Sequence, residues 1–384
     1  MKERALDLEQ GRRLSTEVLE PMKQAFVGKD EIVDLMGICL VAGENLFLLG
    51  PPGTAKSALV RELGRRLEGR SFEYLLTRFT EPSELFGPFD IRKLKEGELI
   101  TNTEGMLPEA SLIFLDELLN ANSAILNSLL MVLNERVFRR GKETRALPAL
   151  MVVGASNRLP EDDALGALFD RFLLRVVCDN VPQEQLAEVL DAGWKLDLGL
   201  HAARPTVDIE TVRALHLALP RVELSRVRPA VVELVLKLRR AGIAISDRRA
   251  VKLQRLVAAS ALICGREYAS VTDLWVFRHI WDTVEQQQVL AELVDAALKG
   301  ASPDPSDHPR ARESGLPDAE ALARDVERIA ERLSDTQTSS ADRSVLRDRL
   351  GVLAARSQWV RDPDARTVLT SKIEALWPRF EQRA

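Results

Sequence analysis

The chain has 384 residues, with 53 Lys and Arg against 58 Asp and Glu, a formal net charge of −5 and 46% apolar residues. This length and apolar content suit two or three domains with buried cores and exclude global disorder. The mild charge argues against a protein that mainly coats nucleic acid. Three widely spaced cysteines fit neither a disulfide framework nor a zinc site, and they suit a reducing cytosol. No apolar run reaches the roughly 18 residues of a membrane span, and the charged N-terminus lacks a signal-peptide core, so we expect a cytoplasmic protein.

The first half of the chain alternates between short apolar runs and helical patterns. The runs that indicate buried strands are 45–50, 72–77, 111–117, 149–157 and 173–177. The helices expected among them are 5–26, 29–42, 54–68 and 121–135. Because strands that alternate with helices form parallel sheets, we predict an α/β fold with a parallel five-stranded sheet.

After residue 180 the strand signals end and only helical patterns continue. The helices expected there are 183–191, 208–218, 228–241, 246–264, 271–282 and 284–298. The stretch 301–318, rich in Pro, Asp and Ser, predicts an exposed linker. Three more helices are expected at 317–334, 341–356 and 363–381. The predicted domains are an α/β nucleotide-binding domain (1–182), an all-α lid (183–300), a linker (301–317) and a C-terminal helical bundle (318–384).

The sequence GPPGTAKS at residues 50–57 lies between a strand pattern and a helix pattern. Such a loop wraps backbone N–H groups around a phosphate, and the next helix adds its dipole. We expect Lys56 to reach the β- and γ-phosphates of ATP and the Ser57 hydroxyl to bind Mg²⁺. The expected loop residues are Gly50, Pro51, Pro52, Gly53, Thr54, Ala55, Lys56, Ser57 and Ala58. The general pattern has Gly in place of Ala55, so we expect the backbone there to avoid positive φ.

Two carboxylates follow the apolar run 112–115. Charged groups at the end of a buried strand are costly unless they serve a metal or a partner. We therefore expect Asp116 to hold Mg²⁺ and Glu117 to orient and polarise the attacking water; a helix-capping acidic pair is the alternative. Asn157 ends another strand at the same sheet edge, where its amide can position the water, although a simple turn asparagine has the same pattern.

These motifs, together with longer strings, resemble the AAA+ superfamily and, within it, the MoxR family, particularly the RavA (regulatory ATPase variant A) branch. The strings that carry the resemblance are FVGKDEIV (26–33), LLGPPGTAKS (48–57), EYLLTRFTEPSELFGPFDI (73–91), GMLPEASLIFLDELLNANSAILNSLLMVLNERVFRRG (105–141), VVGASNRLPEDDALGALFDRF (152–172) and SDRR (246–249). The resemblance covers residues 5–300, and an alanine before the loop lysine is usual in MoxR proteins.

The resemblance implies further roles. Val27 and Gly28 match the segment that lines the adenine pocket. Residues 86–105 resemble an insertion in a helix, and residues 136–147 resemble a hairpin; both face the pore or a partner in related rings. Arg171 matches an arginine finger that reaches the γ-phosphate of an adjacent subunit.

The best match to the sensor-2 arginine of the family is Arg249, with Arg248 as the alternative. From the residues alone, Arg171 could equally form a surface ion pair with Asp170, and SDRR could be a helix cap followed by solvated arginines.

The resemblance also implies a function. It implies a homo-oligomer, in particular a hexamer, because an arginine finger acts only between subunits. MoxR proteins resemble chaperone-like ATPases that remodel protein clients with a von Willebrand factor A-domain partner, and this is the predicted function. The alternatives are a nucleic-acid motor of a defence or restriction type and a nucleotide-switched scaffold without turnover. The motor would use the basic residues of the hairpin, which are Arg136, Arg139, Arg140, Lys142 and Arg145.

The remaining conspicuous residues predict packing rather than chemistry. The histidines, which have no ligand spacing, are His201, His216, His279 and His308. The tryptophans, all expected as packing anchors, are Trp194, Trp275, Trp281, Trp359 and Trp377. Cys264 is expected to be a core thiol. The C-terminal region lacks the small β-rich domain of RavA, so its helices are expected either to pack on the ring or to dock a partner.

Overall fold

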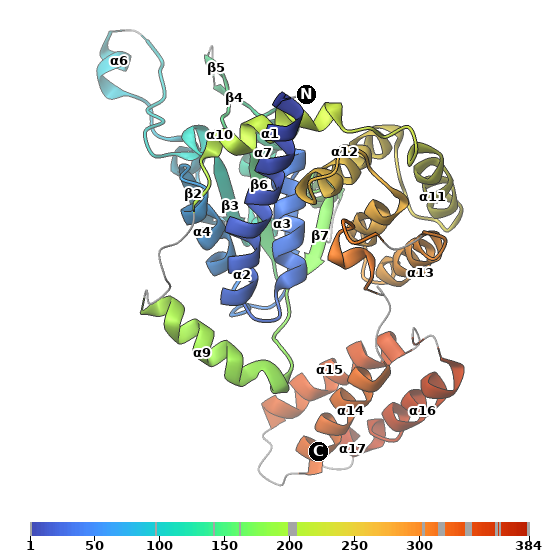
Figure 1. The fold of residues 1–384 in the computed structure, drawn as a ribbon. Helices are drawn as coiled ribbons and strands as arrows, with labels where there is room; N and C mark the ends of the chain where they lie inside the picture. The colour runs from blue at the N-terminus through green and yellow to red at the C-terminus, as the bar shows by residue number, and fades with distance from the viewer. Residues whose placement is uncertain are drawn as a thin grey trace.

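The computed structural model describes residues 2–96, 98–140, 143–160, 163–198, 206–301, 304–313, 319–334, 340–357, 360 and 362–381. Figure 1 shows an α/β part built around a sheet, a group of helices beside the β7 edge of that sheet, and a helical bundle that contains the C-terminus. Among the described residues, no helix is both long and apolar enough to cross a membrane.

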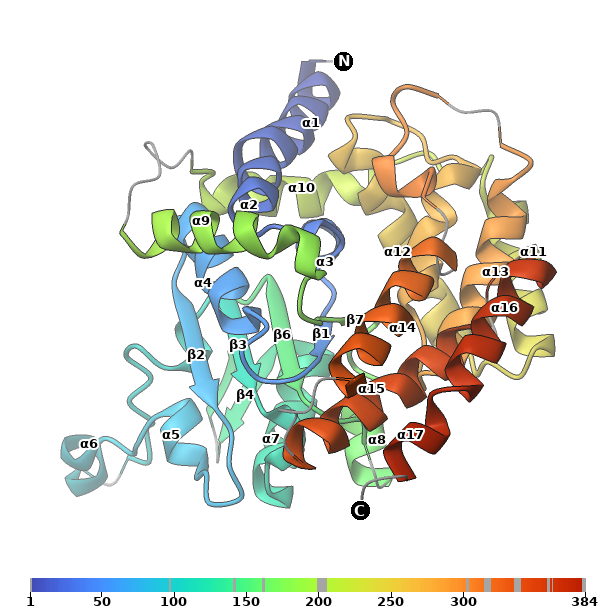
Figure 2. The ribbon, with the colours of Figure 1, turned by 90° about the horizontal axis from the view of Figure 1, so that it is seen from below.

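Five parallel strands form the central sheet in the order β2-β3-β6-β1-β7. Their bounds are Leu46–Leu49 (β1), Ser71–Leu75 (β2), Leu112–Asp116 (β3), Met151–Ser156 (β6) and Leu174–Val177 (β7). Helices lie on both faces of the sheet (Figure 2). Because both faces are covered, the central strands are continuous apolar runs, and the predicted parallel five-stranded α/β fold is confirmed.

The helices of this part follow the predicted order, except that α8 was not predicted. They are α1 (Lys2–Arg13), α2 (Glu20–Ala25), α3 (Asp30–Ala42), α4 (Lys56–Arg66), α7 (Ser123–Glu135) and α8 (Asp163–Phe169). The helix predicted at 5–26 spans α1 and α2, with a π-helical segment Leu14–Leu19 between them. The remaining elements of this part are α5 (Pro82–Phe86), α6 (Ile91–Lys95) and a hairpin of β4 (Val137–Arg140) and β5 (Glu143–Ala146).

The helical part beside β7 packs on α3 and α1 through its longest helix. Its helices are α11 (Arg228–Arg240), α12 (Asp247–Ile263) and α13 (Gln286–Leu298), whereas the preceding α9 (Leu186–Asp197) and α10 (Ile209–Ala218) lie on the α/β part. α1 approaches α12 so closely that a Cβ at Gly11 would lie 2.1 Å from the Leu262 carbonyl oxygen. The helix predicted at 271–282 is instead a 3₁₀ helix, Val271–His279. Its first turn is fixed by Asp273, which is fully buried and paired with Arg266, so the segment follows this network rather than α-helical geometry.

The predicted linker is exposed at five of residues 304–313, but Asp307 and His308 are buried. His308 is only 3% exposed, and its ring stacks on Trp275 with centroids 4.6 Å apart. The Arg310 guanidinium pairs with the buried carboxylate of Asp34, with Nε and Oδ2 2.8 Å apart. Composition alone cannot distinguish these buried polar residues from the solvated residues beside them.

The C-terminal helices form a bundle with its own hydrophobic core. They are α14 (Ala319–Ser334), α15 (Ser340–Ser357), α16 (Pro363–Glu374) and α17 (Trp377–Glu381). The helix predicted at 363–381 is therefore two helices, separated at Ala375 and Leu376. No strand occurs among the described residues of this region.

The tryptophans fall into different environments. Trp275 and Trp281 are buried, and Trp377 packs against the bundle core, as predicted. Trp194 does not anchor the core, because 66% of it is exposed on α9. Trp359 and His201 lie outside the described residues. Cys264 caps the end of α12 and is half-buried rather than part of the core.

Candidate functional site

The phosphate-binding loop connects β1 to α4, and close packing determines its path. The Gly50 N–H donates to the Ser156 carbonyl oxygen, and a Cβ at Gly50 would lie 2.1 Å from the Cys178 carbonyl oxygen. The Thr54 hydroxyl donates to the Pro51 carbonyl oxygen at 2.9 Å. The loop therefore has a defined shape before any ligand enters.

Ala55 contradicts our prediction for its backbone. Its φ is +69°, in the left-handed region, where the sequence predicted negative φ. Ala55 is the residue immediately before α4, and the turn that starts this helix requires the left-handed conformation even though a methyl group disfavours it. Strain of this kind persists where the surrounding structure imposes it, and it concentrates at functional sites.

Lys56 lies folded back under this loop. Its ammonium donates to the carbonyl oxygens of Gly50 and Pro51, both at 2.8 Å, and the side chain is buried. A buried ammonium at the N-terminus of a helix forms a positive site. Phosphate oxygens would satisfy this ammonium better than the two neutral carbonyls.

Ser57 and Asp116 meet at the carboxyl edge of the sheet. The Ser57 hydroxyl donates to Asp116 Oδ2 at 3.4 Å, and Asp116 Oδ1 accepts the Glu117 N–H. One hydroxyl and one carboxylate, completed by phosphate oxygens and water, make the oxygen ligand set that Mg²⁺ prefers. The described residues contain no group of three His, Cys, Asp or Glu side chains that could hold a metal by themselves. Ser57 and Asp116 therefore fit a Mg²⁺ whose remaining ligands are phosphate oxygens and water.

Glu117 lies beside this pair in a left-handed conformation, with φ of +49°. Its burial, followed by the charge of Asp116, raises the pKa of the Glu117 carboxyl, while Lys56 and Arg158 oppose the shift. The Asn120 amide donates to Glu117 Oε2 at 3.3 Å and orients the carboxylate. A carboxylate with a raised pKa is a better proton acceptor for a water molecule.

The sequence analysis missed two residues of this site. Arg158 donates from Nη2 to Asn120 Oδ1 at 3.2 Å, so Arg158, Asn120 and Glu117 form a chain of polar contacts. Arg158 follows Asn157 at the end of β6, which lies between β3 and β1, and Asn157 itself is exposed. The signal in the sequence that could have identified Arg158 is a basic residue directly after the polar residue that ends a strand.

The segment predicted to line the adenine pocket lies near the chain that leaves β7. Gly28 has φ of +71°, and a Cβ there would lie 2.8 Å from Gln185 Oε1 and 2.9 Å from Val181 Cγ1. Val27 is half-buried, and Lys29 donates to the Asp179 carbonyl oxygen. The Cys178 thiol, at the start of the same chain segment, donates to the Thr54 carbonyl oxygen at 3.2 Å. Residues 178–185 thus connect Gly28 with the phosphate loop.

Arg171 lies at the amino-terminal ends of the parallel strands, whereas the phosphate loop lies at their carboxyl ends. It precedes β7, and its carbonyl oxygen accepts from Asn45, which precedes β1. Lys56 follows β1 at the other end of the same parallel strands, so four residues of strand, about 13 Å, separate the two edges. Arg171 therefore cannot serve the nucleotide bound by Lys56 of its own chain in this arrangement.

Arg249 also lies at the Arg171 edge. It lines a small cavity with Arg171, Arg248 and Lys252. Its guanidinium is 6% exposed and bonds to Asp282 and to the carbonyl oxygens of Ala244 and Ile280, whereas Arg248 is exposed. The structure thus does not bring Lys56 and Arg249 together around one nucleotide.

The basic hairpin is largely occupied by contacts within the chain. Arg136 is half-buried and donates to Asn45 Oδ1, and desolvation lowers its pKa to about 10. Arg140 donates to the Gly87 carbonyl oxygen and stacks over Phe89, and Arg145 donates to the Thr103 hydroxyl. Lys142 lies outside the described residues.

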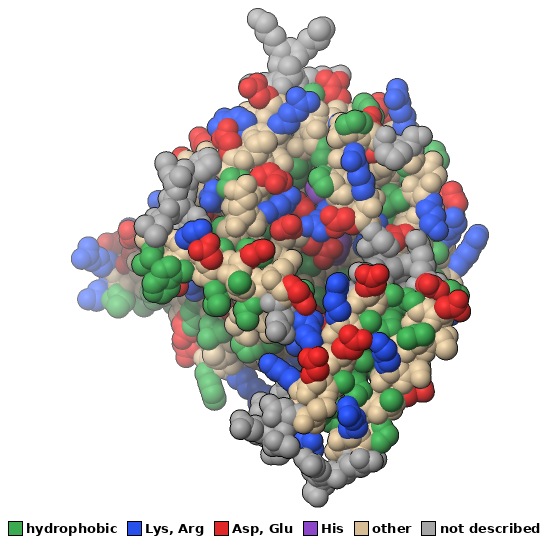
Figure 3. All heavy atoms as spheres, turned by 60° about the horizontal axis from the view of Figure 1, so that its bottom comes forward, with side chains coloured by type: hydrophobic (Ala, Val, Ile, Leu, Met, Phe, Trp, Pro, Cys, Tyr) green, Lys and Arg blue, Asp and Glu red, His purple; other side chains and the backbone are tan. Residues whose placement is uncertain are grey.

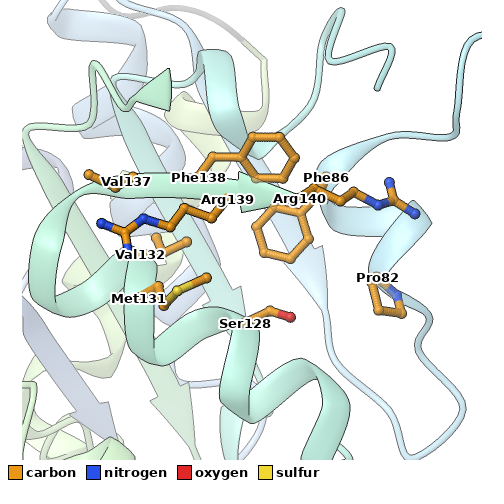
Figure 4. A pocket seen from close by; sticks show the side chains of 9 residues that line it. All are labelled: Pro82, Phe86, Ser128, Met131, Val132, Val137, Phe138, Arg139 and Arg140. Atoms are coloured by element: carbon orange, nitrogen blue, oxygen red, sulfur yellow. The ribbon is translucent and has the colours of Figure 1, made fainter. Parts of the chain in front are cut away.

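The base of this hairpin forms a shallow apolar cleft with α5 and α7, where the rings of Phe86 and Phe138 stack with centroids 5.5 Å apart (Figure 4). This apolar lining, like the contacts of the arginines, differs from the open basic stripe that follows a nucleic-acid backbone.

Comparisons with known proteins agree with this geometry. Residues 12–217 match the family model described as "MoxR domain in the MoxR-vWA-beta-propeller ternary systems", and residues 227–294 match an "AAA lid domain". Two proteins of Methanocaldococcus jannaschii, both named only as uncharacterized, are 36% and 35% identical; the matches cover 69% and 72% of this chain and 70% and 72% of theirs. The chaperone MoxR1 of Mycobacterium tuberculosis is 26% identical over 44% of this chain and 45% of its own.

A solved structure from Cytophaga hutchinsonii, named a "putative ATPase", superposes with a TM-score of 0.61 at 19% identity. The match covers 78% of this chain and 97% of that one. At this identity the likeness concerns the fold alone.

Proposed function

The chain belongs to the MoxR family of AAA+ ATPases, and we propose that it binds ATP with Mg²⁺ and hydrolyses it at the carboxyl edge of its sheet. The observation that carries the proposal is the Ser57–Asp116 contact of 3.4 Å, with Lys56 and Glu117 at the same edge. The phosphate loop, a hydroxyl, a strand-end carboxylate and a second carboxylate are the parts that ATP hydrolysis requires.

Each side chain has a role in this proposal. Lys56 leaves its carbonyl partners and binds the β- and γ-phosphates, and residues 50–55, with the first amides of α4, surround the β-phosphate. Ser57 and Asp116 would hold Mg²⁺, which would neutralise phosphate charge that develops during the reaction. Glu117, oriented by Asn120, accepts a hydrogen bond from the attacking water and then its proton. Asn157 positions that water, while Val27 and Gly28 contact the adenine.

The site is completed by a second subunit. Because Arg171 lies about one strand length from Lys56 of its own chain, it reaches a γ-phosphate only across an interface between copies. The cavity that Arg171 shares with Arg248 and Arg249 brings all three arginines to that interface. Arg249 is held by Asp282, so its exposed neighbour Arg248 is free to turn toward phosphate. A homohexameric ring is the assembly that we propose.

The cellular role that we propose is chaperone-like remodelling of protein complexes with a von Willebrand factor A-domain partner. Its support is the description of the matching family model, which names such a partner, and the chaperone MoxR1 among the relatives. The placement in the RavA-like branch rests on the sequence strings alone and remains part of the proposal. The domain boundaries and a cytoplasmic location are also part of the proposal.

Steady-state ATPase activity tests the proposed site. Glu117→Gln is expected to lower turnover about 10²- to 10⁴-fold, and Arg171→Ala about 10³- to 10⁵-fold. The half-buried Arg213, whose ion-pair partner among the described residues is the nearby Glu210, provides the matched control, and Arg213→Ala is expected to retain full activity.

Mixing two inactive variants tests the sharing of the site between subunits. Lys56→Ala chains keep Arg171, and Arg171→Ala chains keep the phosphate loop, so the mixture restores activity at interfaces that combine the intact halves. Turnover per chain is also expected to fall on dilution. Full activity of Arg171→Ala, with turnover that stays constant on dilution, would refute the shared site.

A further inference from the structure

Helix α9 carries an apolar stripe that is exposed among the described residues. Leu186, Leu190, Trp194 and Leu198 follow one another at intervals of four residues along one face. They are 49%, 66%, 66% and 52% exposed. Figure 3 shows hydrophobic side chains gathered on the surface over this helix. An exposed stripe of this size marks an interaction surface.

The other face of α9 rests on the α/β part. Val189, Ala192, Gly193 and Leu196 are half-buried, and Leu196 packs against the main core. No described residue of α9 is fully buried. Because both faces of the helix are apolar, a second surface is needed to cover the outer one.

A groove of matching character lies between α11 and α12. It has a volume of about 410 Å³. The apolar side chains of its wall include Val232, Leu236 and Val251, which are 53%, 44% and 63% exposed. Arg228 and Arg239 lie at its rim. An apolar groove between two helices is a common receptor for an amphipathic helix.

The charges of the two surfaces are complementary. Residues 184–198 contain four carboxylates and one lysine, whereas the charged residues that line the groove are Arg228, Arg239 and Asp247, with a net positive charge. Opposite charge around two apolar surfaces steers their encounter and selects the partner.

The two surfaces cannot meet within one chain. In both ribbon views α9 lies on one side of the α/β part and α11 on the far side, beyond β7 (Figures 1 and 2). A pair of complementary surfaces on opposite sides of one molecule produces head-to-tail contacts, which close into a ring when the rotation allows.

We propose that the apolar stripe of α9 docks into the α11–α12 groove of a second copy of this chain. This contact rests on the proposed function only in that both require neighbouring copies. The contact holds neighbouring subunits together at a surface outside the nucleotide site. The lid of one subunit thereby holds the α/β part of the next, so a movement of the lid is passed directly to the neighbour.

Cross-linking between two different single-cysteine variants tests the contact. The native Cys39 and Cys178 are buried, and Cys264→Ser removes the half-buried thiol. Leu190→Cys and Val232→Cys chains are mixed with ATP in a Glu117→Gln background and treated with a short bismaleimide. The expected product is a covalent dimer in the mixture, at least tenfold more abundant than in either variant alone. A missing dimer, or one formed equally by Leu190→Cys chains alone, overturns the proposal.

A second measurement uses variants that keep the native cysteines. The double variant Leu190→Lys/Trp194→Lys is expected to weaken self-association at least tenfold in sedimentation velocity, while Leu217→Lys, at an exposed leucine on α10, leaves it unchanged. Equal association of the two variants contradicts the docking. Neither measurement requires hydrolysis, so a cross-link found together with an absence of ATPase activity in the chain that keeps Glu117 would refute the proposed function and retain the contact.

Discussion

The buried His308 predicts a specific loss of stability in mild acid. Its ring is 3% exposed, stacks on Trp275 and accepts the Arg310 N–H at Nδ1, at 3.3 Å. Burial is the largest influence and lowers the pKa of His308 to about 4; Asp34 and Asp273 oppose the shift, while Lys23 and Arg310 add to it. The imidazole is therefore neutral in the folded protein.

The sign of the effect follows from proton linkage. The unfolded chain binds a proton at His308 below a pKa of about 6.5, whereas the folded chain resists it down to about 4. The stability is therefore complete above pH 6.5 and is lost as the pH falls toward 4. Between pH 7 and pH 5 the contribution of His308 to the free energy of unfolding falls by about 2 kcal/mol.

Denaturant unfolding at pH 7 and pH 5, followed by tryptophan fluorescence, measures this loss. His308→Phe keeps an aromatic ring on Trp275 but cannot titrate, so its loss between the two pH values is expected to be about 2 kcal/mol smaller than that of the wild type. The buried His279 and His216, whose pKa values burial also lowers, titrate alike in both proteins and cancel. Equal losses in the two proteins would show that His308 is not held neutral.

Two further predictions concern packing. Arg175 is fully buried and bonds to Asp282 and to the carbonyl oxygens of Phe169 and Trp281. Because Arg175→Met leaves these groups without their partner, it is expected to lower the free energy of unfolding by about 3 to 5 kcal/mol in denaturant unfolding. A change below 1 kcal/mol would contradict this. Leu350 is fully buried in the separate core of the bundle. The substitution Leu350→Ala is expected to lower the free energy of unfolding of the bundle by about 2 to 5 kcal/mol, measured by hydrogen exchange, while exchange in the α/β part stays unchanged.

The phosphate loop and the strand-end carboxylates could be predicted because they depend on local order. Once β1, β3 and β6 are parallel neighbours, the residues that follow them meet at one edge whatever the rest of the chain does. The backbone of Ala55 could not be predicted in this way. A single residue tells little about φ when the surrounding turn decides it, and here the turn imposes the left-handed region on a residue with a Cβ.

The position of Arg249 illustrates a different limit. SDRR predicts a helix start, and the structure has one, with the Ser246 hydroxyl accepting the Arg249 N–H. Which edge of the sheet this helix start faces depends on how α12 packs on α3 and on the Asp282 contact. These are contacts between segments far apart in sequence, so local patterns do not contain them.

Trp194 shows how a correct principle can give a wrong location. Large aromatic residues at helical spacing are packing residues, and from this the sequence predicted a core anchor. The inner face of α9 consists of its own half-buried small and aliphatic side chains, and Trp194 lies on the outer face with Leu186 and Leu190. Burying that face in the groove of a second copy satisfies the same principle between chains. The hydrophobic pattern of α9 therefore describes an assembly rather than a monomer, and single-chain reasoning assigns its outer half to the wrong core.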